Sequence, residues 1–326
     1  MNNSKTIIVI MMVALCSMTC KPAADKKKNL DDDGYVEIIS DLKFDRGLWM
    51  TSSNKADPDF LYARLLDFGS GATGQDTPWR IFQWANYKHS LRNVPEVREG
   101  DKFIYESEST NVTVDRSTGA FSLRIKAQNE YSSPREYFAD WPTIYFDQTL
   151  VRMPVVGELD ELIMEIEFVI NRCDNFMEPE EYNPEELHTA QFMWYVTVIN
   201  QDASHGALND YLWFGLMFYD YREEWTSTTK LQDYGKEDAT GQYIYNVGMK
   251  DILDKPFAIG QKVKIAVNVL PIIKTAIAYA QSQGFLKECL AELMKVNYMN
   301  IGLELPGTFD LDVEICKIGL KAKYKQ

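Results

Sequence analysis

Apolar residues recur at every second position in many stretches of this chain. In residues 162–170, for example, Leu162, Met164 and Ile166 share one face of an extended segment, whereas Glu165 and Glu167 share the other. A period of two indicates a β-strand with one buried and one solvated face. The same pattern covers residues 111–114, 121–128, 190–199, 211–220, 263–270, 299–305 and 308–316. Many such strands predict an all-β chain built as a two-sheet antiparallel sandwich.

Residues 271–294 depart from this pattern and are spaced like a helix. Pro271 suits a first helical position, and Ile272, Ala276 and Ala280 recur at helical spacing. Gly284 interrupts the segment. We therefore expect one or two helices inserted near the C-terminus, which cover an edge or an end of the sandwich.

The beginning of the chain has the three parts of a secretory signal peptide. A polar start with Lys5 is followed by an apolar run over residues 7–15 and then by small or polar residues up to Cys20. The run is too short to span a bilayer. Because it stops at Cys20, ahead of a charged segment, this start resembles that of a bacterial lipoprotein, which implies a lipidated Cys20.

The predicted organisation has three parts. We expect a signal peptide at 1–19, a lipidated Cys20 with a flexible tether at 20–34, and one domain at 35–326. This predicts an exported protein anchored at the outer membrane or cell surface. The chain carries 48 acidic and 34 basic residues and a net charge of −14. So acidic a chain repels phosphate backbones, which argues against a nucleic-acid partner.

Aromatic and planar polar residues stand opposite several of the apolar faces. Flat rings stack on the C–H face of a sugar, and amide, carboxylate and guanidinium groups pair with its hydroxyls. A polysaccharide or oligosaccharide is therefore the expected partner. The candidate ligand-binding residues are Trp141, Gln191, Tyr195, Trp213, Tyr219, Tyr221 and Arg222. The alternative interpretation is that these are core aromatics and ordinary surface positions, with Asp220 and Arg222 forming a surface ion pair.

Four carboxylates are the catalytic candidates, because glycoside hydrolysis needs a pair of them. They are Glu165, Glu167, Asp220 and Glu304. Glu165 and Glu167 lie two residues apart on one strand face, roughly 7 Å along the strand. Gly215 and Gly302, which have no side chain, would let a ligand or another backbone approach. A lyase would instead need a base such as His188 together with a basic residue such as Arg124.

The signal-like start and the strand pattern from about residue 35 to 324 resemble the exported glycan-utilisation lipoproteins of gut-type bacteria with concanavalin A-like jelly rolls. Laminarinase-like hydrolases of this fold carry Glu-x-Asp-x-x-Glu on a strand. Here Glu158 and Asp160 begin that pattern, and Ile163 stands in the place of its last Glu. The resemblance implies no cofactor or catalytic metal, but a structural calcium, for which Asp310 and Asp312 are candidate ligands.

Three functions follow, in order of preference. The first is a surface-tethered carbohydrate-binding protein that uses an aromatic and polar sheet face, because no catalytic signature is intact. The second is a glycoside hydrolase or polysaccharide lyase that uses the same cleft. The third is a structural or adhesin surface lipoprotein without a small ligand.

Overall fold

The computed structural model describes residues 34–326, apart from 86–87, 89, 132, 137 and 235–238. The predicted signal peptide and the lipidation site Cys20 lie outside the described residues. Within these described ranges, no helix is long and apolar enough to cross a membrane.

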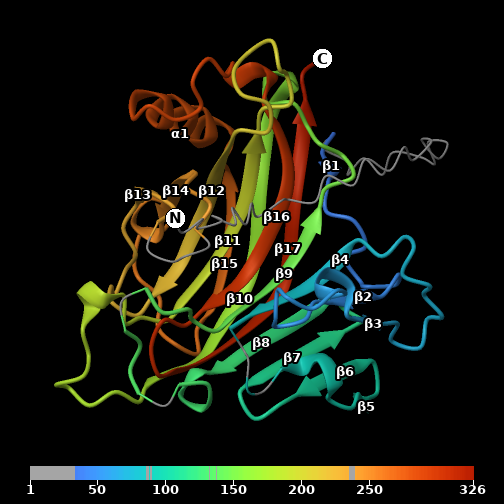
Figure 1. The fold of residues 1–326 in the computed structure, drawn as a ribbon. Helices are drawn as coiled ribbons and strands as arrows, with labels where there is room; N and C mark the ends of the chain where they lie inside the picture. The colour runs from blue at the N-terminus through green and yellow to red at the C-terminus, as the bar shows by residue number, and fades with distance from the viewer. Residues whose placement is uncertain (1–33, 86–87, 89, 132, 137, 235–238) are drawn as a thin grey trace, which may run out of the picture.

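Two large sheets form a sandwich (Figure 1). The eight-stranded sheet has the order β15-β10-β17-β8-β7-β6-β5, and β1 pairs with β17. Its strands are β1 (Val36–Glu37), β5 (Val97–Glu99), β6 (Lys102–Glu106), β7 (Thr110–Asp115), β8 (Ala120–Lys126), β10 (Leu159–Asn175), β15 (Lys262–Asn268) and β17 (Phe309–Tyr324). The predicted all-β, two-sheet jelly-roll sandwich is confirmed.

The nine-stranded sheet has the order β13-β14-β12-β11-β16-β9-β4-β2-β3. Its strands are β2 (Leu48–Met50), β3 (Arg64–Leu66), β4 (Trp79–Trp84), β9 (Thr143–Thr149), β11 (Gln191–Ile199), β12 (Tyr211–Asp220), β13 (Thr229–Gln232), β14 (Tyr243–Gly248) and β16 (Lys295–Glu304). Most neighbours are antiparallel, as expected. The pairs β12–β14 and β2–β4 are parallel, which the alternation of single strands cannot reveal.

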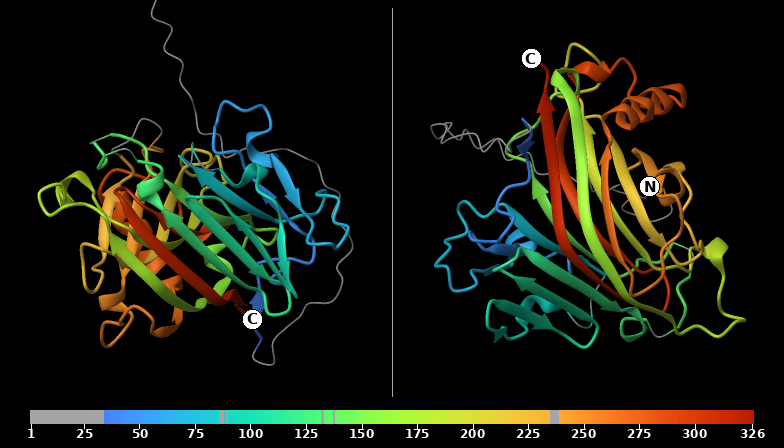
Figure 2. Two further views of the ribbon diagram at one scale, coloured as in Figure 1. Left: turned by 90° about the horizontal axis from the view of Figure 1, so that it is seen from below. Right: turned by 180° about the vertical axis from the view of Figure 1, so that it is seen from behind.

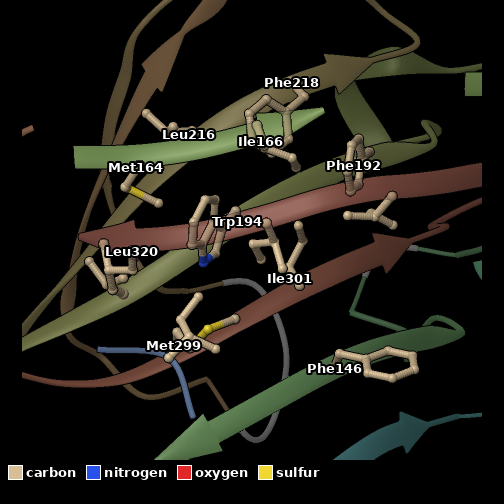
Figure 3. Close-up of a cluster of buried hydrophobic side chains, with 14 of the residues drawn as sticks. Phe146, Met164, Ile166, Phe192, Trp194, Leu216, Phe218, Met299, Ile301 and Leu320 are labelled. Carbon is tan, nitrogen blue, oxygen red and sulfur yellow. The ribbon is translucent and has the colours of Figure 1, made fainter. Parts of the chain in front are cut away.

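The core lies between the two sheets and is built from the apolar faces that the alternation predicts. In β11, Phe192 and Trp194 are fully buried toward the other sheet. Phe168 of β10 packs on Phe192 and on Phe218 of β12, with ring centroids 5.2 and 5.1 Å apart. Figure 3 shows residues of this cluster converging from several strands. Such inward burial leaves the alternate side chains of the nine-stranded sheet on its outer face.

The helix α1 (Leu270–Ser282) lies at the end of the sandwich where the chain also terminates (Figures 1 and 2). Its buried face includes Ile273, Ala276 and Ile277, and it contacts β10 of one sheet and β12 of the other. The helix therefore covers one end of the sandwich, as predicted. It ends just before Gly284, and the second half of the expected segment forms only a 3₁₀ turn. The 3₁₀ turns are Phe60–Tyr62, Leu91–Asn93, Ala127–Asn129, Val156–Glu158, Pro184–Glu186, Met249–Asp251 and Ala291–Leu293.

Candidate functional site

A cavity of about 410 Å³ opens on the outer face of the nine-stranded sheet. Its floor comes from β4, β9, β16, β11, β12 and β14, and the segments that follow β12 and β13 contribute to its wall. Its aromatic lining includes Phe82, Trp84, Trp141, Tyr145, Tyr195 and Trp213. Predicted residues that line it are Trp141, Gln191, Tyr195, Trp213, Asp220, Arg222 and Glu304. The fold thus gathers into one cavity predicted residues as distant in the chain as Trp141 and Glu304, which are 163 positions apart.

Strand register places two of the candidate carboxylates on either side of Gln191. Gln191 of β11 pairs with Glu304 of β16 on one side and with Asp220 of β12 on the other. Neighbouring strands are about 4.8 Å apart, so the backbones of Glu304 and Asp220 are separated by roughly 10 Å across the sheet. Both carboxylates line the same cavity.

A β-bulge in β12 brings Asp220 to the cavity. Met193 pairs with Met217, but Phe192 pairs with Tyr219, so Phe218 is an extra residue in β12. Strict alternation from Trp213 would place Tyr219 on the cavity face and Asp220 on the core face. Because a bulge shifts the alternation by one residue, the opposite arrangement results.

Asp220 is a fully engaged carboxylate. It accepts hydrogen bonds from Thr189 Oγ1 at 2.6 Å and Gln191 Nε2 at 2.6 Å. Arg222 donates three more, from its backbone nitrogen at 3.1 Å, from Nε at 2.9 Å and from Nη2 at 2.6 Å. Burial raises the pKa of Asp220, but the hydrogen bonds and charge of Arg222, with those of Thr189 and Gln191, outweigh it and hold this pKa below its ordinary value. Asp220 is therefore an anion at neutral pH.

Glu304 ends β16 and is held by two donors. Trp141 donates its indole Nε1–H to Glu304 Oε2 at 2.9 Å, and the Tyr145 hydroxyl donates to Oε1. Burial, together with the charge of Glu304, raises the pKa of Tyr145 well above its ordinary value, so this phenol stays protonated as a donor. The guanidinium of Arg135 lies 4.9 Å from the centroid of the Trp141 ring. These contacts fix the carboxylate at the cavity floor.

Two glycines on the floor are covered by tyrosine rings. A Cβ atom at Gly215 would stand 2.5 Å from Tyr195 Cδ1, and one at Gly302 would stand 2.8 Å from Tyr145 Cδ1. The room that a missing side chain leaves is thus filled by the ring of the neighbouring strand and not by an approaching ligand. Tyr145, Met193 and Met217 form a small buried apolar cluster with Phe82 and Tyr195 packed against it.

Glu165 and Glu167 lie on β10 of the other sheet and are not part of the cavity lining. Lys317 Nζ and Lys321 Nζ lie 2.6 and 3.2 Å from Glu165, and Lys264 Nζ lies 2.9 Å from Glu167. Of the four candidate carboxylates, the structure thus brings together Asp220 and Glu304 and places Glu165 and Glu167 apart from them. Alternation correctly gives their solvated face, but it cannot say to which sheet a strand belongs.

Tyr219 and Tyr221 also lie away from the cavity, and this corrects their predicted position. Both pack against the main core, because the bulge turns Tyr219 inward. The Tyr221 ring lies 4.8 Å from that of Phe309 in the other sheet. Both rings therefore pack against the core and do not line the cavity.

The residues considered for a lyase are dispersed. His188 Nδ1 accepts from the backbone nitrogen of Asn183 at 2.9 Å, and its Nε2 bonds the carbonyl of Arg135 at 2.8 Å. Both ring nitrogens are thus engaged by the backbone, which leaves His188 a structural role. Arg124 lies in the eight-stranded sheet and binds Asp310 through Nε and Nη2, at 2.9 and 2.7 Å.

The structural calcium stays a prediction. The Asp310 carboxylate is engaged by Arg124, and Asp312 Oδ1 accepts from Asn171 Nδ2 at 3.2 Å. Among the described residues, no group of three or more His, Cys, Asp or Glu side chains could hold a metal ion.

Sequence reasoning missed several cavity residues, among them Tyr145, Asn246 and Asn300. Tyr145 lies in β9, where the first six residues are all buried, so no alternation marks its outer face. Asn246 lies in the short strand β14, which has a polar residue among buried neighbours. An asparagine among apolar and aromatic residues in a predicted strand is the sequence signal that could have drawn attention to both amides.

No protein-family model matches this chain, and the search of curated proteins gave no match. Among solved structures, it is similar to a meso-active, thermo-stable cellulase derived from the Cel12A cellulase of Rhodothermus marinus, with 10% identity, a TM-score of 0.40, and coverage of 74% of this chain and 99% of that one. It is also similar to the family 11 xylanase from Neocallimastix patriciarum (7% identity, TM-score 0.36, 74% and 99% covered). A third is a metagenome-derived family 12 endoglucanase (11% identity, TM-score 0.37, 76% and 99% covered).

Proposed function

We propose that this protein binds a carbohydrate chain in the cavity of the nine-stranded sheet. The observation that carries this proposal is the combination of stacking rings and planar polar groups in one concave site. Trp213 lies in the lining, and its ring meets Tyr195, Tyr211 and Tyr298 edge-on at centroid distances of 5.8, 5.5 and 6.2 Å. Apolar walls with a few convergent polar groups are what small-ligand sites require.

Binding is favoured over cleavage by the state of one floor carboxylate, Asp220. A general acid needs a carboxyl group whose pKa is raised, so that it carries a proton at neutral pH. The pKa of Asp220 is instead lowered, and all its hydrogen bonds are taken up by Thr189, Gln191 and Arg222. Asp220 is therefore better suited to holding the side chains around it in place than to transferring a proton.

A glycoside hydrolase is the second candidate, and one observation favours it. Glu304 and Asp220 share one cavity floor with a single strand between them. Their backbones are roughly 10 Å apart across the sheet, and a glycoside hydrolase uses a pair of carboxylates that flank the scissile bond. In this candidate, Glu304 is the residue that contacts the reacting bond.

The deciding experiment uses the full chain in affinity gels that contain xylan, mannan, β-glucan or polygalacturonate, combined with an assay for released reducing ends. We expect retention by at least one polysaccharide and no release. Trp213→Ala should weaken retention about fivefold to tenfold, because a lost aromatic stacking contact costs about 1–1.5 kcal/mol. Trp49→Ala is the matched control, since Trp49 lies on the same sheet outside the cavity and donates to Gly74 O at 3.1 Å.

Two results would change this assignment. Failure of the wild type to bind any polysaccharide would exclude carbohydrate binding by this cavity. Release of reducing ends that Glu304→Gln abolishes, with Glu165→Gln fully active, would establish the hydrolase.

We further propose that the protein is exported and tethered to the cell surface or outer membrane through a lipid on Cys20. The apolar run before Cys20 and the charged segment after it support this. Metabolic labelling with a radioactive fatty acid should mark the wild type and leave Cys20→Ala unlabelled. Equal labelling of both proteins would exclude the anchor at this residue.

A further inference from the structure

Two asparagines of the cavity lining each have a buried amide oxygen without a hydrogen-bond partner. These oxygens are Oδ1 of Asn246 on β14 and Oδ1 of Asn300 on β16. Both asparagines line the cavity, and their side chains are largely buried, with residue exposures of 4% and 8%. Buried polar atoms nearly always have a partner, so an unpaired acceptor in a binding cavity calls for an explanation.

The two asparagines belong to one row of side chains across the sheet. Asn246 pairs with Gly215, Gly215 with Tyr195, and Tyr195 with Asn300. Residues in register on neighbouring strands project from the same face. Three strand spacings separate the two asparagines, which amounts to about 14 Å between their backbones. The Tyr195 ring therefore lies between two acceptors, with each acceptor toward one end of the row.

The opposite end of each amide is already used. Burial raises the pKa of both Tyr195 and Tyr298, and against this larger rise the Asn246 amide lowers the pKa of Tyr195 and the Asn300 amide lowers that of Tyr298. Among hydrogen-bonding groups, only a donor lowers the pKa of a phenol, so the amide nitrogens, and not the oxygens, are the groups directed at the two hydroxyls. The oxygens are thereby left to accept from a donor that the described residues do not supply.

The charges of the lining indicate the kind of ligand. Arg222 is bound to Asp220, and Lys55 Nζ lies 3.7 Å from the centroid of the Trp84 ring. The lining also contains Glu223, Asp233 and Glu304. A carboxylate or sulfate on a ligand would meet acceptors and negative charge here, whereas hydroxyl groups would meet the acceptors that they need.

We propose that Asn246 and Asn300 are ligand-binding residues that accept hydrogen bonds from hydroxyl groups of a neutral sugar chain, and that they set a preference for neutral over acidic glycans. This inference rests on the proposed function and deepens it. The row gives a flat ring, Tyr195, between two acceptors, which matches a saccharide with hydroxyl groups at its rim.

The test compares Asn246→Leu and Asn300→Leu with the wild type on a neutral polysaccharide that the wild type retains. Each variant should lose about tenfold in affinity or more, the cost of a lost hydrogen bond to a buried acceptor. Asn297→Leu is the matched control. Its Oδ1 already accepts from Thr197 Oγ1 at 2.5 Å, and it is not among the cavity-lining residues. This control should lower the stability to urea and leave the affinity unchanged.

A change in the ligand tests the same contacts independently of the folding of any variant. O-methylation of the polysaccharide removes its donors, so binding by the wild type should weaken. If the asparagines accept hydrogen bonds from those hydroxyl groups, the leucine variants have already lost these bonds. Methylation should therefore lower the affinity of the leucine variants less than it lowers that of the wild type, because the two changes remove the same contact.

The outcomes separate the inference from the function on which it rests. If the wild type binds no glycan, both fall before any variant is compared. If it binds but both leucine variants bind equally well, or if it prefers polygalacturonate, carbohydrate binding stands and the assigned role of the asparagines is wrong.

Discussion

Arg222 holds Asp220 through two parallel hydrogen bonds, from Nε to Oδ1 at 2.9 Å and from Nη2 to Oδ2 at 2.6 Å. The carboxylate side chain is only 6% exposed and the guanidinium side chain is 30% exposed. Two residues that are only two positions apart in the chain thus form a bidentate ion pair at the end of β12. Such a pair fixes the planar geometry of both groups, and with it one side of the cavity.

Removal of the positive charge of Arg222 should lower the stability of the folded protein. We expect Arg222→Met to lower the free energy of unfolding by about 2–4 kcal/mol at pH 7, because a buried carboxylate loses its counter-charge. Urea unfolding measures this. The double variant Asp220→Asn/Arg222→Met should recover part of the loss, and equal stability of Arg222→Met and the wild type would contradict the assigned role of the pair.

The same ion pair predicts how the stability difference between the wild type and Arg222→Met depends on pH. The folded pKa of Asp220 lies below its ordinary value, so its stabilising effect is present above that ordinary value and is lost as the pH falls through the folded pKa. The stability gap between the wild type and Arg222→Met should therefore shrink on acidification below about pH 4. A gap that stays constant down to pH 2 would show that the ionisation of Asp220 is not its source.

The two glycines of the floor should respond differently to alanine. A Cβ at Gly302 would stand 1.9 Å from the carbonyl oxygen of Ile144, so the backbone of β9 must move. The three atoms nearest to a Cβ at Gly215 would all be side-chain atoms, two of Tyr195 and one of Asn246. We expect Gly302→Ala to cost about 2–3 kcal/mol of stability, and Gly215→Ala to cost less while weakening glycan retention.

Thermal unfolding and affinity gels of both variants test this contrast. A smaller stability loss for Gly302→Ala than for Gly215→Ala would be at odds with the close approach of β9 and β16. Unchanged retention by Gly215→Ala would show that the position of the Tyr195 ring does not matter for binding.

Glu165 should be dispensable for the cavity. It is paired with Lys317 and Lys321 on the other sheet, so Glu165→Gln should leave glycan retention unchanged and alter stability by no more than about 1 kcal/mol. Glu304→Gln serves as the comparison within the cavity. A loss of retention on Glu165→Gln would mean that the binding surface is on the eight-stranded sheet.

Glu37 should make stability fall as the pH rises from acid to neutral. Burial raises its pKa to about 7, although backbone hydrogen bonds from Leu320 and Ile39 and the charge of Lys321 oppose this. A carboxyl group whose folded pKa is raised favours folding below its unfolded value of about 4.5, and this contribution is lost as the pH approaches about 7.

Glu37→Gln should therefore flatten the stability profile between pH 4.5 and 7, an effect of at most about 3 kcal/mol. Urea midpoints across this range measure the slope. The same slope in both proteins would mean that another group titrates.

The sequence predicts the faces of single strands well. In β11, the separation of Phe192 and Trp194 from Gln191 and Tyr195 follows from alternation, because side chains on a strand point to opposite sides in turn. The helix near the C-terminus and the sandwich class follow from the same local periodicities. These features depend on residues that are close in the chain, so local pattern is enough to determine them.

Tertiary structure alone decided which faces meet. Gln191 lies between Glu304 and Asp220 because β11 pairs with β16 and β12, a choice made by contacts far apart in sequence. Glu165 belongs to the other sheet for the same reason. The extra residue Phe218 reverses the alternation in β12, so Asp220 reaches the cavity and Tyr219 does not. A bulge is a property of how two strands pair, and no single strand carries it.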